Sequence, residues 1–408
     1  MLHIIQNTLF NREKAKSLSN FSLAESISIE NFHKKIGNTQ TPLCNLTGLA
    51  KELGVGKVLL KDESHRFGLN AFKALGASYA MYRQIKINPQ IKTFCTATDG
   101  NHGKGVAWIA KKLGRKALIY MPKGTSYARS NSIEEEGAKV IIIDDGYDNA
   151  VKIANSHVKK RNTSSEKNTW SLIQDTAWEG YEEIPLDIMK GYWTQAHEIS
   201  RQIKEEKIDL LFLQSGVGSW AASIINYILK QWDTPPICVG VEPNNARCLY
   251  ESIKAGDRVS FKSRNQTIMA GLDCGTVSTL AWKILKHSLT GVVTISDEVS
   301  KLAGSIYLLP PNNFKERGFK EKYWRIQFKT TDKENWEQFL KYIQKPTNEE
   351  IRSYVELVFK ELISNEKKLK KFKIEDIEMK IQSASETYDR ENERKLIFLK
   401  EQAQMARL

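Results

Sequence analysis

The stretch FCTATDGNHGKGVAWIAKKLG, residues 94–114, contains the three parts of a strand–turn–helix unit. Its first four residues are mostly apolar, which indicates a short buried strand. After the turn of residues 98–103, apolar side chains recur at the three- and four-residue spacing of a helix, which Gly114 would end. Units of this kind build α/β proteins, whose ligands bind at the turns that follow the strands.

The same alternation of strands and helices runs through the first 300 residues. Further short apolar runs that indicate buried strands lie at residues 58–60, 117–120, 140–143, 170–173, 211–213 and 238–241. Helical patterns separate most of these runs, which is typical of parallel sheets. The sequence therefore predicts an α/β fold with parallel sheets.

The composition is that of an ordinary globular protein, with 41% hydrophobic and 27% charged residues. No apolar run approaches the roughly 20 residues of a membrane span, and the N-terminus lacks the pattern of a secretion signal. Five scattered cysteines without a CxxC pair predict neither a disulfide framework nor a metal site, and they fit a cytoplasmic location. The 61 basic residues are interleaved with 48 acidic ones, so the net charge of +13 does not by itself predict a nucleic-acid partner.

A second turn, KDESHRFGLNAFK at residues 61–73, follows a strand and opens a helix at Lys73. The positive end of a helix dipole disfavours the protonated form of an amine, so the sequence predicts a neutral, nucleophilic lysine. By residue type alone, a lysine is usually an exposed surface residue. The apolar neighbours Ala71, Phe72 and Ala74 favour a dry site instead.

The turn of residues 98–103, TDGNHG, offers consecutive backbone N–H groups at a helix that is expected to begin near Gly103. This arrangement suits a carboxylate. Asp99 is unusual there, because its charge would repel a bound carboxylate. Asp99 is either a helix cap or a working acid or base, and the sequence leaves both interpretations open.

Two later turns add further candidates. Residues 214–219, QSGVGS, place glycines before a helix, where backbone amides can bind a phosphate, although a purely structural turn explains them equally well. The Walker lysine is absent, which disfavours a nucleoside triphosphatase. Residues 174–181, QDTAWEGY, form an acidic and aromatic cluster whose alternative interpretation is the start of a buried helix. Together, the four turns describe a site for pyridoxal phosphate and an amino acid.

These segments resemble the diaminopropionate ammonia-lyases, which are pyridoxal-phosphate enzymes with the tryptophan-synthase-β-like fold. The resemblance covers about residues 41–299 and rests on KDESHRFGLNAFKALGAS, ATDGNHGKGVAW, QDTAWEGY, FLQSGVGS, GVEP and TIMAGLDCG. It implies a homodimer whose subunit has two α/β domains. The larger one comprises residues 1–87 and 191–305, and the smaller one comprises residues 88–190.

The resemblance also implies roles for individual residues. Lys73 would form the Schiff base with pyridoxal phosphate, and Asn101 would contact the ring oxygen of the cofactor. The backbone amides that would bind the phosphate belong to Gly216, Val217, Gly218 and Ser219. The catalytic residues would be Lys73, Asp99 and Asp175. The residues that would line the substrate are Thr98, Asp99, Gly100, His102 and Asp175.

The implied reaction is an α,β-elimination that converts 2,3-diaminopropionate and water to pyruvate and two ammonia molecules. Lys73 and Asp99, on opposite faces of the substrate, would serve its two enantiomers. The pair of segments TDGNHG and QDTAWEGY separates this family from the serine and threonine dehydratases.

The last hundred residues depart from the family. In the family, a GESGA-like turn supplies the hydroxyl that faces the pyridine nitrogen of the cofactor. No such turn follows residue 300 of this chain. Apolar residues at helical spacing predict that residues 306–408 form a helical, basic region of unknown role. Two alternatives stay open: a non-catalytic copy of the fold whose tail binds a partner, and a lyase that resembles the serine and threonine dehydratases.

Overall fold

The computed structural model describes residues 3–47, 50, 55–98, 100–163, 168–204, 206–261, 263, 265–297 and 299–300. The predicted helical region of residues 306–408 lies outside these residues. Contacts divide the chain into two compact units. One unit, Ile4–Leu43 with Lys61–Thr294, contains the pocket described below and both four-stranded sheets apart from two end residues. The described part of the other unit includes residues 44–47, 50 and 55–60, with most of the small sheet β2-β3.

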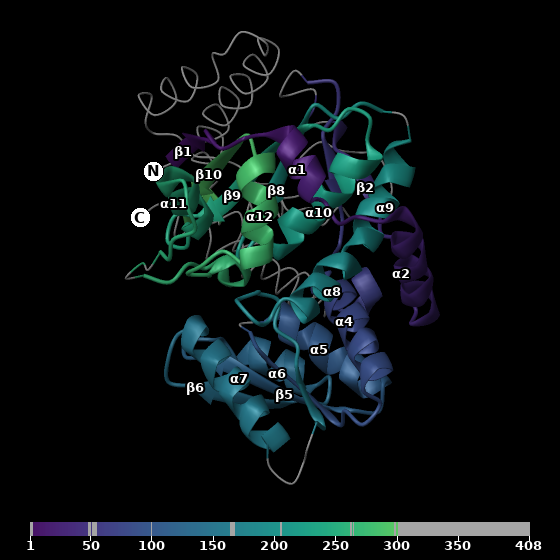
Figure 1. Cartoon of the computed structure of the whole chain (residues 1–408), viewed down its shortest axis with the longest axis vertical. Helices are drawn as coiled ribbons and strands as arrows, with labels where there is room; N and C mark the ends of the chain where they lie inside the picture. The colour runs from purple at the N-terminus through teal and green to yellow at the C-terminus, as the bar shows by residue number, and fades with distance from the viewer. Residues whose placement is uncertain are drawn as a thin grey trace, which may run out of the picture. The chain divides into compact units, whose positions relative to one another are not determined.

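The helices and strands alternate along most of the chain, as expected (Figure 1). The helices are α1 (Arg12–Leu18), α2 (Leu23–Lys35), α4 (Lys73–Ile87), α5 (Asn101–Lys112), α6 (Tyr127–Glu134), α7 (Tyr147–Thr163), α8 (Glu183–Gly191), α9 (Trp193–Ile203), α10 (Ser219–Gln231), α11 (Cys248–Ala255) and α12 (Thr279–Ser288). The strands are β1 (His3–Gln6), β2 (Leu43–Asn45), β3 (Leu59–Lys61), β4 (Thr93–Ala97), β5 (Lys116–Pro122), β6 (Lys139–Ile143), β7 (Trp170–Leu172), β8 (Leu210–Gln214), β9 (Ile237–Pro243) and β10 (Gly291–Ile295). None of the helices in the described residues has the length and apolar character needed to cross a membrane.

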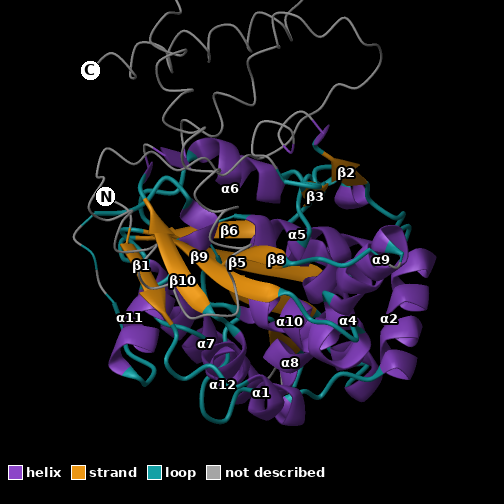
Figure 2. Ribbon diagram, turned by 90° about the horizontal axis from the view of Figure 1, so that it is seen from above, coloured by secondary structure: helices purple, strands orange, loops and turns teal. Residues whose placement is uncertain are grey.

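One sheet has the strand order β6-β5-β4-β7, and all its strands run parallel. Figure 2 labels its strands β5 and β6. From β4 the chain continues outward through β5 to β6, and it then returns to place β7 on the other side of β4. The segments that leave β4 and β7 therefore start side by side and diverge. A reversal of this kind opens a crevice at the carboxyl ends of the strands, where ligands bind in α/β proteins.

Alternate residues of this sheet pack on opposite faces. Phe94 and Ile119 share an apolar cluster with residues of α4 and α5, whereas Cys95 and Leu118 share another cluster with residues of α7. Strands that are covered on both faces have continuous apolar runs in their sequence, which explains why the strands of this sheet could be predicted. The outer strand β6 differs, because Ile142 is 55% exposed.

The other four-stranded sheet has the order β1-β10-β9-β8, with β8 and β9 parallel. Within the described residues β8 is the last strand on its side, and Phe212 is 46% exposed. The prediction of a strand at residues 211–213 is thus confirmed, but the prediction that Phe212 is buried is wrong. A strand at the edge of a sheet has fewer neighbours to cover its side chains. The overall α/β architecture with parallel sheets is confirmed.

Helix α4, which begins at Lys73 as expected, packs between α5 and α8 (Figure 1). Its first turns are buried, since Ala74 and Leu75 have no exposed surface. Helix α5 begins at Asn101, two residues earlier than the expected start near Gly103. Asn101 and His102 therefore belong to the first helical turn. Gly100 precedes the helix as its cap residue, and its non-helical backbone marks the true start.

Candidate active site

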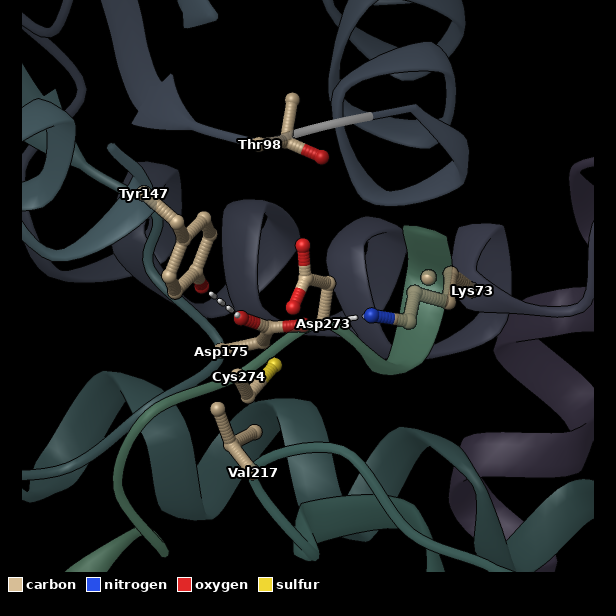
Figure 3. Close-up of a pocket in the computed structure, with 8 residues that line it drawn as sticks. Lys73, Thr98, Tyr147, Asp175, Val217, Asp273 and Cys274 are labelled. Atoms are coloured by element: carbon tan, nitrogen blue, oxygen red, sulfur yellow. Dashed lines mark hydrogen bonds and ion pairs between the residues drawn. The ribbon is translucent and has the colours of Figure 1, made fainter. Parts of the chain in front are cut away.

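A pocket lies where segments that leave β4, β7 and β8 meet the start of α4 (Figure 3). Its lining residues are Lys73, Thr98, Tyr147, Asp175, Val217, Gly271, Asp273 and Cys274. The structure thus brings together four residues that the sequence had singled out, although they are up to 144 positions apart in the chain (217 − 73). The crevice expected from the strand order is where they meet.

Lys73 and Asp175 form an ion pair in this pocket, with 2.9 Å between the lysine Nζ and the carboxylate Oδ2. Burial alone would raise the pKa of Asp175. The positive charge of Lys73, together with hydrogen bonds from Lys73 and Tyr147, instead holds that pKa well below its usual range. Asp175 is therefore ionised at neutral pH. The amine that the sequence predicted to be neutral is found in an ion pair instead.

Gln174, the residue before Asp175, is fully buried and uses its whole side-chain amide. Its Oε1 accepts the backbone N–H of Ala97 at 3.0 Å and the hydroxyl of Thr96 at 3.1 Å. Its Nε2 donates to the carbonyl of Ala97 at 3.0 Å and to the hydroxyl oxygen of Tyr147 at 2.9 Å. One amide thereby joins the end of β4 to the segment after β7, and it holds the Tyr147 hydroxyl beside Asp175.

The turn of residues 215–218 leads into α10, whose first residue is Ser219. Gly218 has a backbone φ of +85°, which residues other than glycine rarely adopt. A Cβ at this position would also lie 2.8 Å from the Leu285 side chain. A Cβ at Gly216 would lie 3.1 Å from the Sγ of Cys274 and 3.2 Å from a backbone oxygen. Glycine at position 218 thus gives the turn its positive φ, and glycine at position 216 lets the turn pass close to the segment 271–274. The Ser219 hydroxyl donates to the carbonyl of Asp175 at 2.6 Å, which ties the turn to the ion pair.

The other predicted residues lie around the pocket. The Thr98 Oγ1 accepts the backbone N–H of Gly100 at 3.0 Å. His102 is buried, and its Nε2 lies 2.7 Å from the carbonyl of Ile173, to which it must donate. Burial lowers the pKa of His102, so the ring is neutral. Asn101 is exposed at the start of α5 and is not one of the lining residues, and Asp99 lies outside the described residues.

Four lining residues were not predicted from the sequence: Tyr147, Gly271, Asp273 and Cys274. Tyr147 follows β6 by four positions, so the rule that ligands bind after strand ends could have identified it. The other three lie within TIMAGLDCG, a segment that carried the family resemblance. No charge pattern or helix start in that segment had indicated which of its side chains enters the pocket.

A buried ionic network fixes the segment before Lys73. The Arg66 guanidinium is fully buried and donates to both carboxylate oxygens of Glu198, at 2.8 Å each, and to Glu63. The following residues Phe67 and Asn70 have positive φ angles of 53° and 55°, which cost free energy for residues other than glycine. The network offsets this strain, because a bidentate arginine–carboxylate contact allows little movement.

The family model described as "Pyridoxal-phosphate dependent enzyme" matches residues 35–305. The chain is 39% identical over 333 residues to diaminopropionate ammonia-lyase of Escherichia coli K12, covering 76% of this chain and 81% of that protein. It is 43% identical over 294 residues to the Salmonella typhimurium LT2 protein of the same name, covering 65% and 71% of the two chains.

The crystal structure of the Escherichia coli enzyme in complex with an aminoacrylate-PLP azomethine reaction intermediate matches with a TM-score of 0.70 and 38% identity. The match covers 77% of this chain and 81% of that one. The chain therefore belongs to the diaminopropionate ammonia-lyase family of pyridoxal-phosphate-dependent enzymes.

Proposed function

We propose that this protein converts 2,3-diaminopropionate and water to pyruvate and two molecules of ammonia by α,β-elimination. The observation that carries the proposal is the Lys73–Asp175 ion pair, which lies in a pocket beside the glycine turn at the start of α10. A reactive amine, an ionised carboxylate and a phosphate-binding turn are the parts that the reaction needs. The similarity to two proteins named diaminopropionate ammonia-lyase supports the choice of substrate.

The residues present fit pyridoxal phosphate. Lys73 offers the amine that binds the cofactor. Gly216 and Gly218 keep side chains away from the backbone of residues 216–219, at the positive end of the α10 dipole, where a phosphate is stabilised. The bound cofactor supplies an electron sink for the charge that develops when the Cα proton is removed. Asn101 is the proposed partner of the cofactor ring oxygen.

The chain's own residues carry the proton transfers and the binding. Lys73 accepts the Cα proton of one enantiomer, and Asp99 accepts it on the opposite face for the other. Asp175 attracts an ammonium group of the substrate, because its lowered pKa keeps it charged. Backbone amides of residues 98–102, with Thr98, Gly100 and His102 among them, bind the substrate carboxylate.

The same family supports several proposals about organisation. The larger domain comprises residues 1–87 and 191–305, and the smaller one comprises residues 88–190. The strands of the two four-stranded sheets fall within these separate ranges. The protein acts in the cytoplasm, and it acts as a homodimer. Sedimentation of the purified enzyme tests whether it is a dimer.

One observation favours a second function, that of a non-catalytic copy of the fold whose tail binds a partner. No GESGA-like turn follows residue 300, so the sequence lacks the hydroxyl that would face the pyridine nitrogen. The visible spectrum of the purified protein, freed of unbound pyridoxal phosphate, separates the two functions, because a lysine-bound cofactor absorbs near-visible light and an empty fold does not.

The experiment that tests the proposed function measures pyruvate from L- and D-2,3-diaminopropionate, L-serine and L-threonine. We expect rapid conversion of both diaminopropionate enantiomers and slow conversion of the hydroxy amino acids. Asp99→Asn should lose most activity with the D-enantiomer and less with the L-enantiomer. Serine conversion as fast as that of diaminopropionate would instead assign the protein to the dehydratase-like alternative.

A further inference from the structure

Two carboxylates line the pocket, and they reach it from distant parts of the chain. Asp175 follows β7, whereas Asp273 follows the short 3-10 helix Ala270–Leu272. Figure 3 shows the Asp273 side chain turned into the pocket, with Thr98, Asp175 and Lys73 around it. Among the lining residues, one lysine therefore stands against two acidic side chains. This balance suits a substrate with more than one positive group.

The two carboxylates have different surroundings. Asp175 lies beside the reactive amine: its Oδ2 accepts from Lys73 at 2.9 Å, and its Oδ1 accepts from Tyr147 at 3.3 Å and from Gln174 at 3.4 Å. The position of the Lys73 amine also marks the place that the substrate's α-amino nitrogen takes during the reaction. Asp175 thus serves the reacting end of the substrate, and a second ammonium group requires another acceptor.

Asp273 stands on a segment that is well fixed. Its backbone N–H donates to the carbonyl of Ala270 at 3.1 Å, and the neighbouring N–H of Cys274 donates to Leu272 at 2.9 Å. The glycine turn packs against the same segment, since a Cβ at Gly216 would lie 3.1 Å from the Cys274 sulfur. The carboxylate is therefore presented by a rigid backbone, which lowers the entropic cost of binding a cation.

We propose that Asp273 binds the β-ammonium group of the substrate and makes the site select diamino acids over hydroxy amino acids. This inference rests on the proposed function and names the residue that sets its specificity. Serine carries a neutral hydroxyl where diaminopropionate carries the ammonium, so it forms no ion pair with Asp273, and the hydrogen bond that its hydroxyl can donate is equally available to an asparagine oxygen at this position. Loss of the negative charge should thus weaken recognition of diaminopropionate and leave recognition of serine unchanged.

The test compares Asp273→Asn with the wild-type enzyme, using kcat/KM for 2,3-diaminopropionate and the inhibition constant of serine. We expect kcat/KM to fall by roughly ten- to a hundredfold, mainly through KM, because a charged hydrogen bond is lost. The inhibition constant of serine should stay within about a factor of two. Asp273→Glu, which keeps the charge, should retain the preference in part. Asp233→Asn makes the same chemical change at an exposed position and should alter neither constant.

Absorbance of bound cofactor and thermal unfolding show whether each variant is loaded and folded. If Asp273→Asn does not fold, Asp273→Ser is measured in the same way. Equal losses for diaminopropionate and serine, or no loss for either, would overturn the role of Asp273. A wild-type enzyme that converts serine but not diaminopropionate would contradict the proposed function itself, which separates the two failures.

Discussion

Two lysines of one segment, Lys61 and Lys73, form ion pairs of nearly equal length in very different surroundings. The Lys61 Nζ lies 2.8 Å from Glu198, and the Lys73 Nζ lies 2.9 Å from Asp175. The Lys61 side chain is only 8% exposed and donates to two further protein oxygens, whereas that of Lys73 is 22% exposed and borders the pocket. The surroundings, rather than the ion pair itself, distinguish a structural lysine from a reactive one.

The largest effect that we expect comes from Lys73→Ala, which removes the amine that binds the cofactor. Activity should fall at least about a thousandfold. Borohydride reduction followed by peptide mass spectrometry should find no cofactor adduct. The matched variant Lys61→Met should keep the adduct and lose stability instead. A covalent adduct that persists in Lys73→Ala would show that another lysine binds the cofactor.

Glu198→Gln should have the largest effect on stability. It leaves the buried charges of Arg66 and Lys61 without their shared carboxylate, which costs roughly 3–5 kcal/mol of unfolding free energy. Asp175→Asn is the matched variant at the pocket and should cost less than about 2 kcal/mol, because water can reach the lysine there. Urea denaturation followed by fluorescence measures both. Equal losses would mean that burial does not separate the two pairs.

Acidification should weaken the buried network. Burial alone would raise the pKa of Glu198, but Arg66 and Lys61 lower it from 4.5 to about 2. The folded protein thus takes up this proton at lower pH than the unfolded chain does. The stabilisation is complete above about pH 4.5 and is lost as the pH falls towards 2, by about 3 kcal/mol in total.

Unfolding free energies at pH 6, 4 and 3 check this prediction. Glu198→Gln has no carboxyl group at this position and should lose less stability over the same range. The prediction does not survive if the variant and the wild type show the same acid dependence.

The smallest effect is expected at the surface pair of Lys283 and Glu182. Their charged atoms lie 3.4 Å apart, and the two side chains are 57% and 44% exposed. Exposed ion pairs contribute at most about 1 kcal/mol, so Lys283→Ala should change the thermal midpoint by only a few degrees. A loss as large as that of Glu198→Gln would contradict the view that burial decides the energetic weight of these pairs.

Much of this architecture follows from local sequence. The apolar run of β4, the turn after it and the helix start at Lys73 were all predictable, because periodicity and glycine positions act within a few residues. The exposure of Ile142 and Phe212 was not predictable in the same way. Which strand lies at the edge of a sheet depends on the order of the strands, and local sequence does not encode that order directly.

The candidate site shows the same limit. Lys73 and Asp175 were each singled out from their own segments, but their contact joins residues 102 positions apart. Tyr147 and Asp273 enter the pocket only because distant segments fold together, and the local sequence did not indicate that either side chain points into it. The chemistry of the site could thus be predicted from residue types, whereas its full membership required the three-dimensional structure.

The two ion pairs are also completed at different times during synthesis. A ribosome adds roughly 5–20 residues per second, so Asp175 emerges between about 5 and 20 s after Lys73. Glu198 follows its partner Lys61 by 137 positions, and it is made after Asp175 because it lies further along the chain. A nascent chain that has just acquired both partners of the pocket pair still lacks the carboxylate that allows Arg66 to be buried. The strained segment before Lys73 can thus be fixed in place only after α9 has been made.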